Sequence, residues 1–169
     1  AGKVRAIGAS NFTTARLRQS LEASERARLP RYESLQPEYN LYDRSGYEAE
    51  LEPLCREAGI GVISYFSLAR GFLSGKYRSA ADLGRSPRGE GIGKYLDARG
   101  QRILAALDEV AARYEATPAQ VALAWLIARP GITAPIASAT SLVQLEDMVA
   151  ATHLTLDPAA IARLDATRE

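Results

Sequence analysis

One stretch of the sequence, residues 61–77, combines residue types that suit a ligand with a planar ring and phosphate groups. It opens with a short apolar strand pattern, which two aromatic residues, Tyr65 and Phe66, follow directly. Its end holds two glycines and two cations, Arg70 and Lys76. An aromatic face can stack on a flat ring, and cations beside flexible turns attract phosphates. A buried strand with core aromatics and a solvated basic loop would show the same pattern, so this stretch alone leaves both interpretations open.

The composition is that of one domain with an ordinary hydrophobic core. The 169 residues are 47% hydrophobic and 24% charged, which is typical of globular proteins. The net charge of +1 gives no field that would attract nucleic acid or an anionic membrane. No apolar run approaches the roughly 18 residues of a membrane helix, and no basic-then-apolar leader opens the chain. The single cysteine, Cys55, is expected to be a buried structural thiol and fits a reducing, cytoplasmic location.

Strand patterns alternate with helix patterns along the chain. Strands are predicted at residues 4–7, 34–36, 62–64 and 133–137. Helices are predicted after the N-caps Thr13, Thr117 and Ser141, after Asp157, and within residues 47–58 and 103–114. The first three strands begin about 30 residues apart, which predicts parallel strands with helical crossovers. Such a chain is either half of an eightfold barrel or a small open parallel sheet.

Each predicted strand has polar residues at its carboxyl end. They are Ser10 and Asn11, Gln36, Ser64 with Ser67, and Ser138 with Thr140. In both candidate folds, ligands bind at the carboxyl ends of parallel strands. Because all four ends are polar, we favour a ligand site over a purely structural sheet.

Common catalytic and metal-binding motifs are missing from the sequence. Residues 89–95 resemble a phosphate loop, but Arg88 stands where its first glycine would be. His153 is isolated and is expected on the surface, so a zinc site is not indicated. Charged residues such as Glu109 and Arg113 are expected to pair on solvated helix faces. The sequence offers binding groups but no convincing acid, base or nucleophile.

Several motifs, taken in order along the chain, resemble those of the aldo-keto reductase family. Residues 4–12, VRAIGASNF, resemble the "IGVSNF" strand of that family, and residues 36–41, QPEYNL, resemble its next strand. Residues 64–77, SYFSLARGFLSGKY, resemble the "SYSPLARGFLTGKY" strand and loop. Residues 117–130 and 134–145 are similar to the last crossover helix and the last strand. The resemblance covers nearly the whole chain.

The family folds as a (βα)8 barrel that binds NADP(H), less often NAD(H), and reduces aldehydes and ketones to alcohols by hydride transfer. The resemblance implies that residues 1–169 form one domain, the carboxyl-terminal half of a TIM barrel with its fifth to eighth strands. The family's catalytic Asp, Tyr, Lys and His belong to the amino-terminal half, so no catalytic residue is assigned here. The expected substrate is a small carbonyl compound, and the expected partner is the missing half or a second copy. The alternative is a non-catalytic NADP(H)-binding or interaction module.

The resemblance also implies which residues bind the cofactor. Groups that would hydrogen-bond the nicotinamide carboxamide are Ser10, Asn11 and Gln36, and the residue that would stack on its ring is Tyr65. Residues that would line the pyrophosphate are Phe66, Ser67, Leu68, Arg70 and Lys76. Residues that would hold the adenosine end are Ser138, Thr140, Gln144 and Asp147.

Some of these roles have structural alternatives. Gln144 could complete a capping box with Ser141, Tyr65 could belong to the barrel core, and Asp147 could act only on a helix dipole. NADP(H) is favoured over NAD(H), although Gln144 stands where many members have an arginine for the 2′-phosphate. Residues that could supply that contact instead are Arg85 and Arg88.

The sequence departs from the family pattern at other cofactor positions. Phe66 and Ser67 replace a small polar residue and a proline, and Met148 replaces an asparagine that contacts adenine. The polar segment at residues 78–94 is expected to cover the cofactor. A half barrel is also expected to have open strand edges and an apolar, uncovered inner face.

Overall fold

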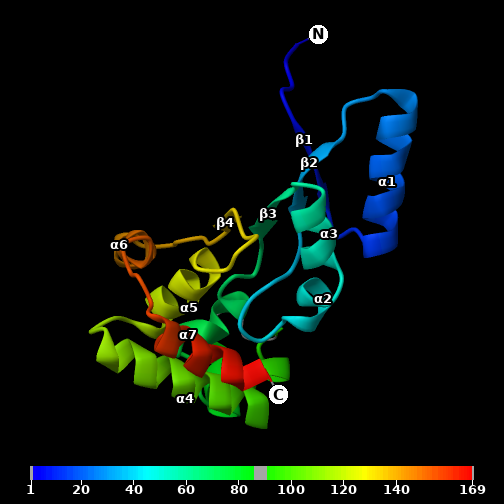
Figure 1. Ribbon diagram of the computed structural model, residues 1–169. Coiled ribbons are helices and arrows are strands. Elements are labelled where there is room, and N and C mark those ends of the chain that lie inside the picture. The colour runs from blue at the N-terminus through cyan, green and yellow to red at the C-terminus, as the bar shows by residue number, and fades with distance from the viewer. Residues whose placement is uncertain (1, 86–90, 169) are drawn as a thin grey trace.

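A parallel β-sheet organises the chain. The computed structural model describes residues 2–85 and 91–168 and contains a four-stranded sheet in the order β1-β2-β3-β4 (Figure 1). The strands are β1 (Ile7–Ser10), β2 (Tyr32–Gln36), β3 (Gly61–Ser64) and β4 (Ala134–Pro135). All three pairings are parallel, which confirms the predicted strands with helical crossovers.

Helices connect the strands and follow the last one. They are α1 (Thr14–Ala27), α2 (Ser45–Glu48), α3 (Leu51–Glu57), α4 (Ala98–Arg113), α5 (Pro118–Ile127), α6 (Leu142–Ala151) and α7 (Pro158–Asp165). Short 3-10 segments are η1 (Ala69–Ser74), η2 (Ala80–Arg85), η4 (Gly93–Tyr95) and η5 (Ala166–Arg168). The predicted caps are confirmed, because the side chains of Thr13, Thr117, Ser141 and Asp157 each accept a backbone N–H bond at a helix start. Among the described residues, no helix is long and apolar enough to cross a membrane.

The first strand begins later than predicted. The sequence pattern places it at residues 4–7, whereas β1 begins at Ile7. Ile7 is the first residue with a partner, Tyr32 at the start of β2, and Val4 is 72% exposed. An apolar pattern without a neighbouring strand has no ladder to join, so the prediction of residues 4–7 is wrong. At the other edge, β4 is shorter than the predicted residues 133–137.

The two faces of the sheet differ in burial. Ala9, Leu35 and Val62 lie side by side in the register, and all three are buried. Gly8 and Ser34, which pair with each other and precede Ala9 and Leu35, face the opposite side of the sheet. Gly8 is exposed and Ser34 is half-buried. The uncovered face is therefore small and polar over β1 and β2, where an apolar face was expected.

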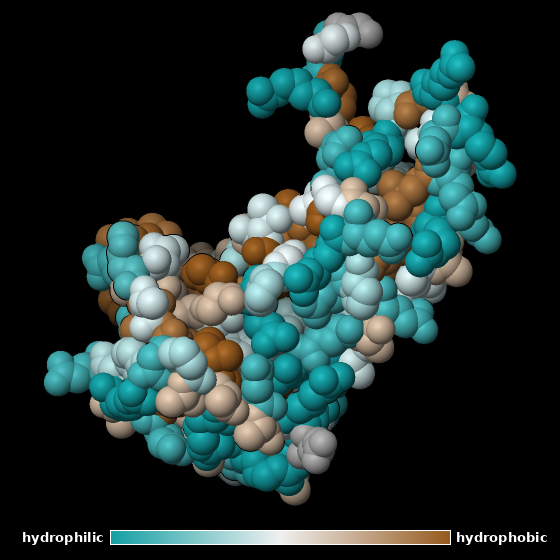
Figure 2. Space-filling view, viewed as in Figure 1, coloured by the Kyte–Doolittle hydropathy of each residue, from teal (hydrophilic) through white to brown (hydrophobic). Residues whose placement is uncertain are grey.

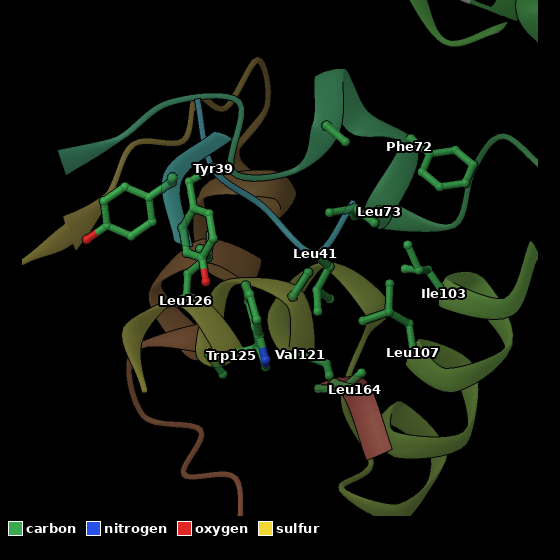
Figure 3. Packing of buried hydrophobic residues seen from close by; sticks show 14 of the residues in the cluster. Tyr39, Leu41, Phe72, Leu73, Ile103, Leu107, Val121, Trp125, Leu126 and Leu164 are labelled. Atoms are coloured by element: carbon green, nitrogen blue, oxygen red, sulfur yellow. The ribbon is translucent and has the colours of Figure 1, made fainter. Parts of the chain in front are cut away.

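The hydrophobic core lies around α5, which is apolar on every side. Its residues Val121 to Leu126 are all buried, as the sequence predicts for such a helix. Trp125 lies beside Tyr39 from the segment after β2, with ring centroids 5.6 Å apart (Figure 3). On the other side of the core, Ile103 and Leu107 of α4 lie near Leu73 of η1. This core holds the carboxyl ends of β2 and β3 in place.

Two predictions about single side chains are confirmed and one is wrong. Cys55 is buried, and burial raises the pKa of its thiol to about 11, while His153 is exposed. Glu109 and Arg113 do not pair with each other. Glu109 instead accepts a bond from Arg163 at 2.6 Å, and Arg113 binds Asp157. Both residues therefore join α4 to the α7 region, because helix packing offers closer partners than the next turn.

Apolar side chains remain exposed beside the open edge of the sheet. Helix α6 follows the edge strand β4 and stands apart from α1 at the other end of the molecule (Figure 1). Leu142 and Val143 at its start are 76% and 74% exposed, and brown surface gathers over this helix in Figure 2. Ala151 is the buried residue of α6. Among the described residues the sheet ends at β1 and β4, as expected for the first and last strands, and the exposed apolar residues of α6 follow the β4 edge.

Candidate functional site

A strained turn follows β3 at its carboxyl end. Tyr65 still pairs with Glu38 through a single parallel bridge, and the chain then leaves the sheet. Phe66, Ala69 and Arg70 have φ angles of 52°, 47° and 58°, in the left-handed region. For a residue with a Cβ atom, this conformation costs on the order of 1 kcal/mol. Such strain persists mainly at ligand sites and switches, which makes this turn a candidate site.

The turn leaves successive backbone N–H groups without partners. Its carbonyl groups are used internally, because Ala69 N donates to Phe66 O at 2.7 Å and Gly71 N donates to Leu68 O at 2.8 Å. The N–H groups of Phe66, Ser67 and Leu68 have no acceptor in the described part of the chain. Successive N–H groups in a turn with left-handed residues form a concavity that binds anions.

Two cations lie at the same turn. The guanidinium of Arg70 lies 4.4 Å from the centroid of the Phe66 ring, and Lys76 Nζ lies 5.0 Å from the Tyr77 ring. A Cβ atom on Gly71, whose φ is 99°, would meet Lys76 Cε at 3.1 Å. Glycine at this position therefore lets the lysine side chain lie against the turn, and the turn gains a second positive charge.

The start of α6 forms an opposing wall. Gln144 Oε1 accepts bonds from the Thr140 N–H at 2.9 Å and the Thr140 hydroxyl at 3.1 Å. The Gln144 N–H donates to Ser141 Oγ at 3.3 Å. The side chain thus reaches Thr140, whereas a full capping box would need it to reach the Ser141 N–H. The predicted capping box is therefore only half formed, and the Gln144 side chain ties the tail of β4 to the helix start.

Asp147 is held by the amino-terminal end of α5. Its carboxylate accepts bonds from the Thr117 hydroxyl at 3.1 and 3.0 Å and from Gln120 Nε2 at 2.7 Å. Thr117 and Gln120 also form the predicted capping box of α5. Because Asp147 lies beyond the first turn of α6, the alternative role on the helix dipole is wrong. The carboxylate instead fastens α6 to α5.

These two walls enclose a cleft of about 510 Å³. Lining residues from the turn after β3 are Tyr65, Phe66, Ser67, Leu68, Arg70, Gly71, Ser74 and Lys76. Lining residues from α5, β4 and α6 are Ala119, Leu123, Ile136, Ala137, Ser138, Gln144, Asp147 and Met148. The turn after β3 and the start of α6 are far apart in sequence, and the parallel sheet brings them together.

Sequence reasoning missed the part of the cleft that α5 contributes. Ala119 and Leu123 are one helical turn apart on α5, which predicts a shared face. The surrounding residues are apolar on all sides, however, so no pattern distinguished this face from the core. Gly71 and Ser74 were also missed, although both belong to the stretch that the sequence singled out.

Four predicted residues lie outside the cleft lining, but hydrogen bonds connect them to the site. Tyr65 donates its hydroxyl proton to Asn11 Oδ1 at 2.8 Å. Ser10 Oγ donates to Gln36 O at 3.1 Å. The fourth, Thr140, donates to Gln144, as described above. Ser10, Asn11 and Gln36 thus continue the site along the carboxyl ends of β1 and β2.

Tyr65 stands where these two parts of the site meet. Its side chain is half-buried, and its ring centroid lies 5.1 Å from that of Phe66. Burial, together with the negative charges of Glu38 and Asp43, raises the pKa of the Tyr65 hydroxyl. The residue is therefore a neutral, hydrogen-bonded aromatic surface at neutral pH.

The polar segment before α4 is anchored at both of its described ends. Arg78 forms two hydrogen bonds with Asp108, at 2.6 and 2.8 Å, and Ile92 is fully buried. Arg88 and the Arg85 side chain, predicted to contact a 2′-phosphate, lie outside the described residues, as do residues 89 and 90 of the phosphate-loop-like motif. Within the described residues, no group of His, Cys, Asp and Glu side chains is placed to hold a metal ion.

Comparison with known proteins places this chain in a family. Residues 1–169 match the aldo/keto reductase family. The chain is 30% identical over 171 residues to Protein tas of Escherichia coli, covering 100% of this chain and 49% of that protein. It is 32% identical over 164 residues to the NADH-specific methylglyoxal reductase of E. coli, covering 94% and 47%. A crystal structure of the thermostable aldo-keto reductase Tm1743 with the inhibitor epalrestat superposes with a TM-score of 0.72 at 25% identity, covering 98% of this chain and 49% of that one.

The chain therefore belongs to the aldo/keto reductase family. The relatives named by the comparisons include oxidoreductases, and the structural match confirms the TIM-barrel type of fold. The chain spans about half the length of the relatives that it matches.

Proposed function

We propose that the cleft binds a nicotinamide dinucleotide, NADP(H) in preference to NAD(H), as the hydride donor for a small carbonyl substrate. One observation carries the proposal. Phosphate-binding groups after β3 and polar groups at α6, which are distant in sequence, line the same 510 Å³ cleft. One wall carries the side chains of Arg70 and Lys76 together with the backbone N–H groups of residues 66–68. Such a combination suits a pyrophosphate.

Each part of the site has a role in this proposal. Tyr65 stacks on the nicotinamide ring and exposes one ring face to the substrate, and the carboxamide contacts come from Ser10, Asn11 and Gln36. The pyrophosphate lies along residues 66–68 with Arg70 and Lys76, and the adenosine end contacts Ser138, Thr140, Gln144 and Asp147. When bound, the nicotinamide supplies the hydride that reduces a carbonyl carbon. The residues of this chain bind and orient it.

The preference between the two cofactor forms rests on the family resemblance. The cations among the described lining residues, Arg70 and Lys76, both belong to the turn after β3, whereas Asp147 places a carboxylate at the other wall. A carboxylate near the ribose favours the 2′-hydroxyl of NAD(H) over a 2′-phosphate. Measuring the Kd of NADPH and of NADH for the same preparation decides between them, and tighter binding of NADH would reverse the proposed preference.

We also propose that this chain is the cofactor-binding, carboxyl-terminal half of a barrel, whose amino-terminal half supplies the proton donor for the carbonyl oxygen. The coverage of 49% of the relatives supports a half-length match, and the choice of the carboxyl-terminal half rests on the family resemblance of the sequence motifs. The open edge at β4 and the exposed residues Leu142 and Val143 would then lie against that half. Turnover of a reactive aldehyde by the 169-residue chain with NADPH would contradict the assignment.

Calorimetric titration of the 169-residue chain with NADPH tests the proposed function. Saturable binding is expected, with an affinity loss of roughly tenfold for Tyr65→Ala and roughly tenfold or more for Lys76→Ala, because each removes one direct contact. His153→Ala, an exposed position away from the cleft lining, is the matched control and should bind like the unsubstituted chain. Absence of binding by a chain that melts cooperatively would overturn the proposal in favour of a module that uses other surfaces.

A further inference from the structure

The residue that holds the strained turn after β3 is Asn40, which does not line the cleft. Asn40 is fully buried in the segment after β2. Its Oδ1 accepts bonds from the N–H groups of Tyr42 and Asp43, both at 2.9 Å. Its Nδ2 donates to Asp43 Oδ2 at 3.3 Å and to Phe66 O at 3.1 Å. The side chain therefore uses its two donors and two acceptor positions, and its amide cannot flip without losing all four bonds.

The bond to Phe66 is a side-chain contact that joins the two segments just beyond their last backbone bonds. Tyr65 N donates to Pro37 O at 3.0 Å, and Tyr39 N donates to Tyr65 O at 3.4 Å. Phe66 then turns into the left-handed region and leaves the ladder. In a regular strand the Phe66 carbonyl would face β4, as the Ser64 carbonyl does in accepting from Ile136 N, but the left-handed turn brings it to the Asn40 amide.

This bond fixes the direction of one peptide plane in the cleft. The Phe66 carbonyl accepts from Asn40 Nδ2 and also from Ala69 N at 2.7 Å. Because a trans peptide is planar, holding the Phe66 C=O from two sides also sets the direction of the Ser67 N–H, which points the opposite way. Ser67 lines the cleft, and its N–H has no acceptor among the described residues.

We infer that Asn40 is a positioning residue for the anion site of the cleft. It acts through the Phe66–Ser67 peptide, directs the Ser67 N–H toward a bound diphosphate, and does not touch the ligand. The inference rests on the proposed function. It extends that proposal by naming a residue that orients one of the N–H groups proposed to bind the phosphates. The Asp43 carboxylate that accepts from Asn40 also accepts from Tyr95 at 3.0 Å and from Lys94 at 3.0 Å.

An exchange of two side chains separates this positioning role from a purely structural one. In Asn40→Asp, the donor to Phe66 O is lost and two carboxylates face each other. In Asn40→Asp with Asp43→Asn, the amide of the new asparagine can donate to the new aspartate, so the local pair and its charge are kept while the donor to Phe66 remains absent. Asp43→Asn alone keeps the Asn40–Phe66 bond and is the matched control.

The affinity for NADPH and the melting temperature are measured for the four proteins, together with inhibition of NADPH binding by inorganic pyrophosphate. We expect the double variant to regain most of the melting temperature lost by Asn40→Asp, yet to bind both NADPH and pyrophosphate roughly tenfold more weakly. Asp43→Asn should keep its affinity within about threefold. In the free proteins, the Ser67 amide resonance should shift in both Asn40 variants and stay in place in Asp43→Asn.

Two outcomes would overturn the inference, and they differ from failure of the proposed function. If the double variant regains NADPH affinity together with its melting temperature, Asn40 is only structural. If the double variant binds NADPH more weakly but pyrophosphate inhibits that binding as in the unsubstituted chain, Asn40 does not act on the anion site. Failure of the unsubstituted chain to bind NADPH would instead refute the proposed function and this inference with it.

Discussion

The two ends of α5 have opposite surroundings. At its carboxyl-terminal end, Trp125 lies beside charged side chains that pair with one another within the protein. At its amino-terminal end, Thr117 and Ala119 border the open cleft and the exposed helix α6. The first region contributes stability, and the second leaves polar groups available for a ligand.

The closed end joins three distant parts of the chain. Glu48 Oε1 accepts from Arg44 Nε at 2.8 Å and from the Tyr39 hydroxyl at 2.7 Å. Asp165 Oδ1 accepts from Trp125 Nε1 at 3.1 Å and lies 3.1 Å from Arg44 Nη1. The Arg44 and Glu48 side chains are only 4% and 6% exposed. Removing the Glu48 charge would leave the buried Arg44 guanidinium compensated only by the more exposed Asp165.

The open end shows the reverse arrangement. The turn after β3 keeps three backbone N–H groups unpaired among the described residues, and Leu142 and Val143 of α6 are largely exposed. These features cost stability in isolation. They are the features that the proposed cofactor and the proposed amino-terminal half of the barrel would cover.

The largest effect is expected at the closed end, from Glu48→Gln. The substitution keeps the shape of the side chain but leaves Arg44 buried beside a neutral amide. We expect a loss of about 3–5 kcal/mol in the free energy of unfolding, measured by urea denaturation. Glu109→Gln breaks an exposed pair with Arg163 and should cost less than about 1 kcal/mol. Equal losses of unfolding free energy in the two variants would show that the buried ion pairs stabilise the protein no more than an exposed pair does.

The same variant gives a pH dependence of known sign. Burial alone would raise the pKa of Glu48, but hydrogen bonds from Tyr39 and Arg44 lower it below its usual 4.5. A carboxylate whose folded-state pKa is depressed stabilises the protein above its unfolded-state pKa and loses that contribution as pH falls through the folded-state value. The stability difference between the unsubstituted chain and Glu48→Gln should therefore be constant above about pH 4.5 and shrink below it. A difference that grows on acidification would refute this account.

A smaller effect is expected at the amino-terminal end of α5, beside the cleft, from Thr117→Ala. The substitution removes the N-cap of α5 and the hydroxyl that binds Asp147. We expect a loss of about 1 kcal/mol in unfolding free energy, with weaker NADPH binding because α6 is less firmly held. Thr13→Ala removes a similar cap from α1, a helix that does not line the cleft, and should lower stability without changing the Kd. Unchanged binding in Thr117→Ala would show that Asp147 positions α6 without this bond.

Local patterns predicted most of the fold. The capping residues Thr13, Thr117 and Ser141 and the apolar helix α5 lie where the sequence indicated, because caps and helical periodicity depend on near neighbours. The start of β1 was misplaced, because a strand begins only where a neighbouring strand pairs with it. For β1 that neighbour is β2, which is distant in sequence. The prediction that Glu109 pairs with Arg113 was wrong for a related reason, because residues of the α7 region, distant in sequence, are the partners of both.

The candidate site was predictable only in part. Residues in the stretch from Tyr65 to Lys76 were identified from their types and from the family resemblance, and the structure brings most of them together with α6. The roles of Asn40 and of the Thr117–Asp147 bond were not predictable. Both depend on backbone strain or on helix contacts between segments that only the folded chain places side by side.

The smallest effect on stability is expected at the open end, from Leu142→Ser combined with Val143→Ser. Both side chains are more than 70% exposed, so their loss should change the unfolding free energy by less than about 0.5 kcal/mol. Leu164→Ser makes the same chemical change at a fully buried position and should cost at least about 2 kcal/mol. If α6 lies against the amino-terminal half of the barrel, the double variant should bind a separately produced amino-terminal half more weakly in sedimentation experiments while remaining as stable as the unsubstituted chain. Unchanged association would place the partner surface elsewhere, and a large loss of stability would show that the two side chains belong to the core of this chain.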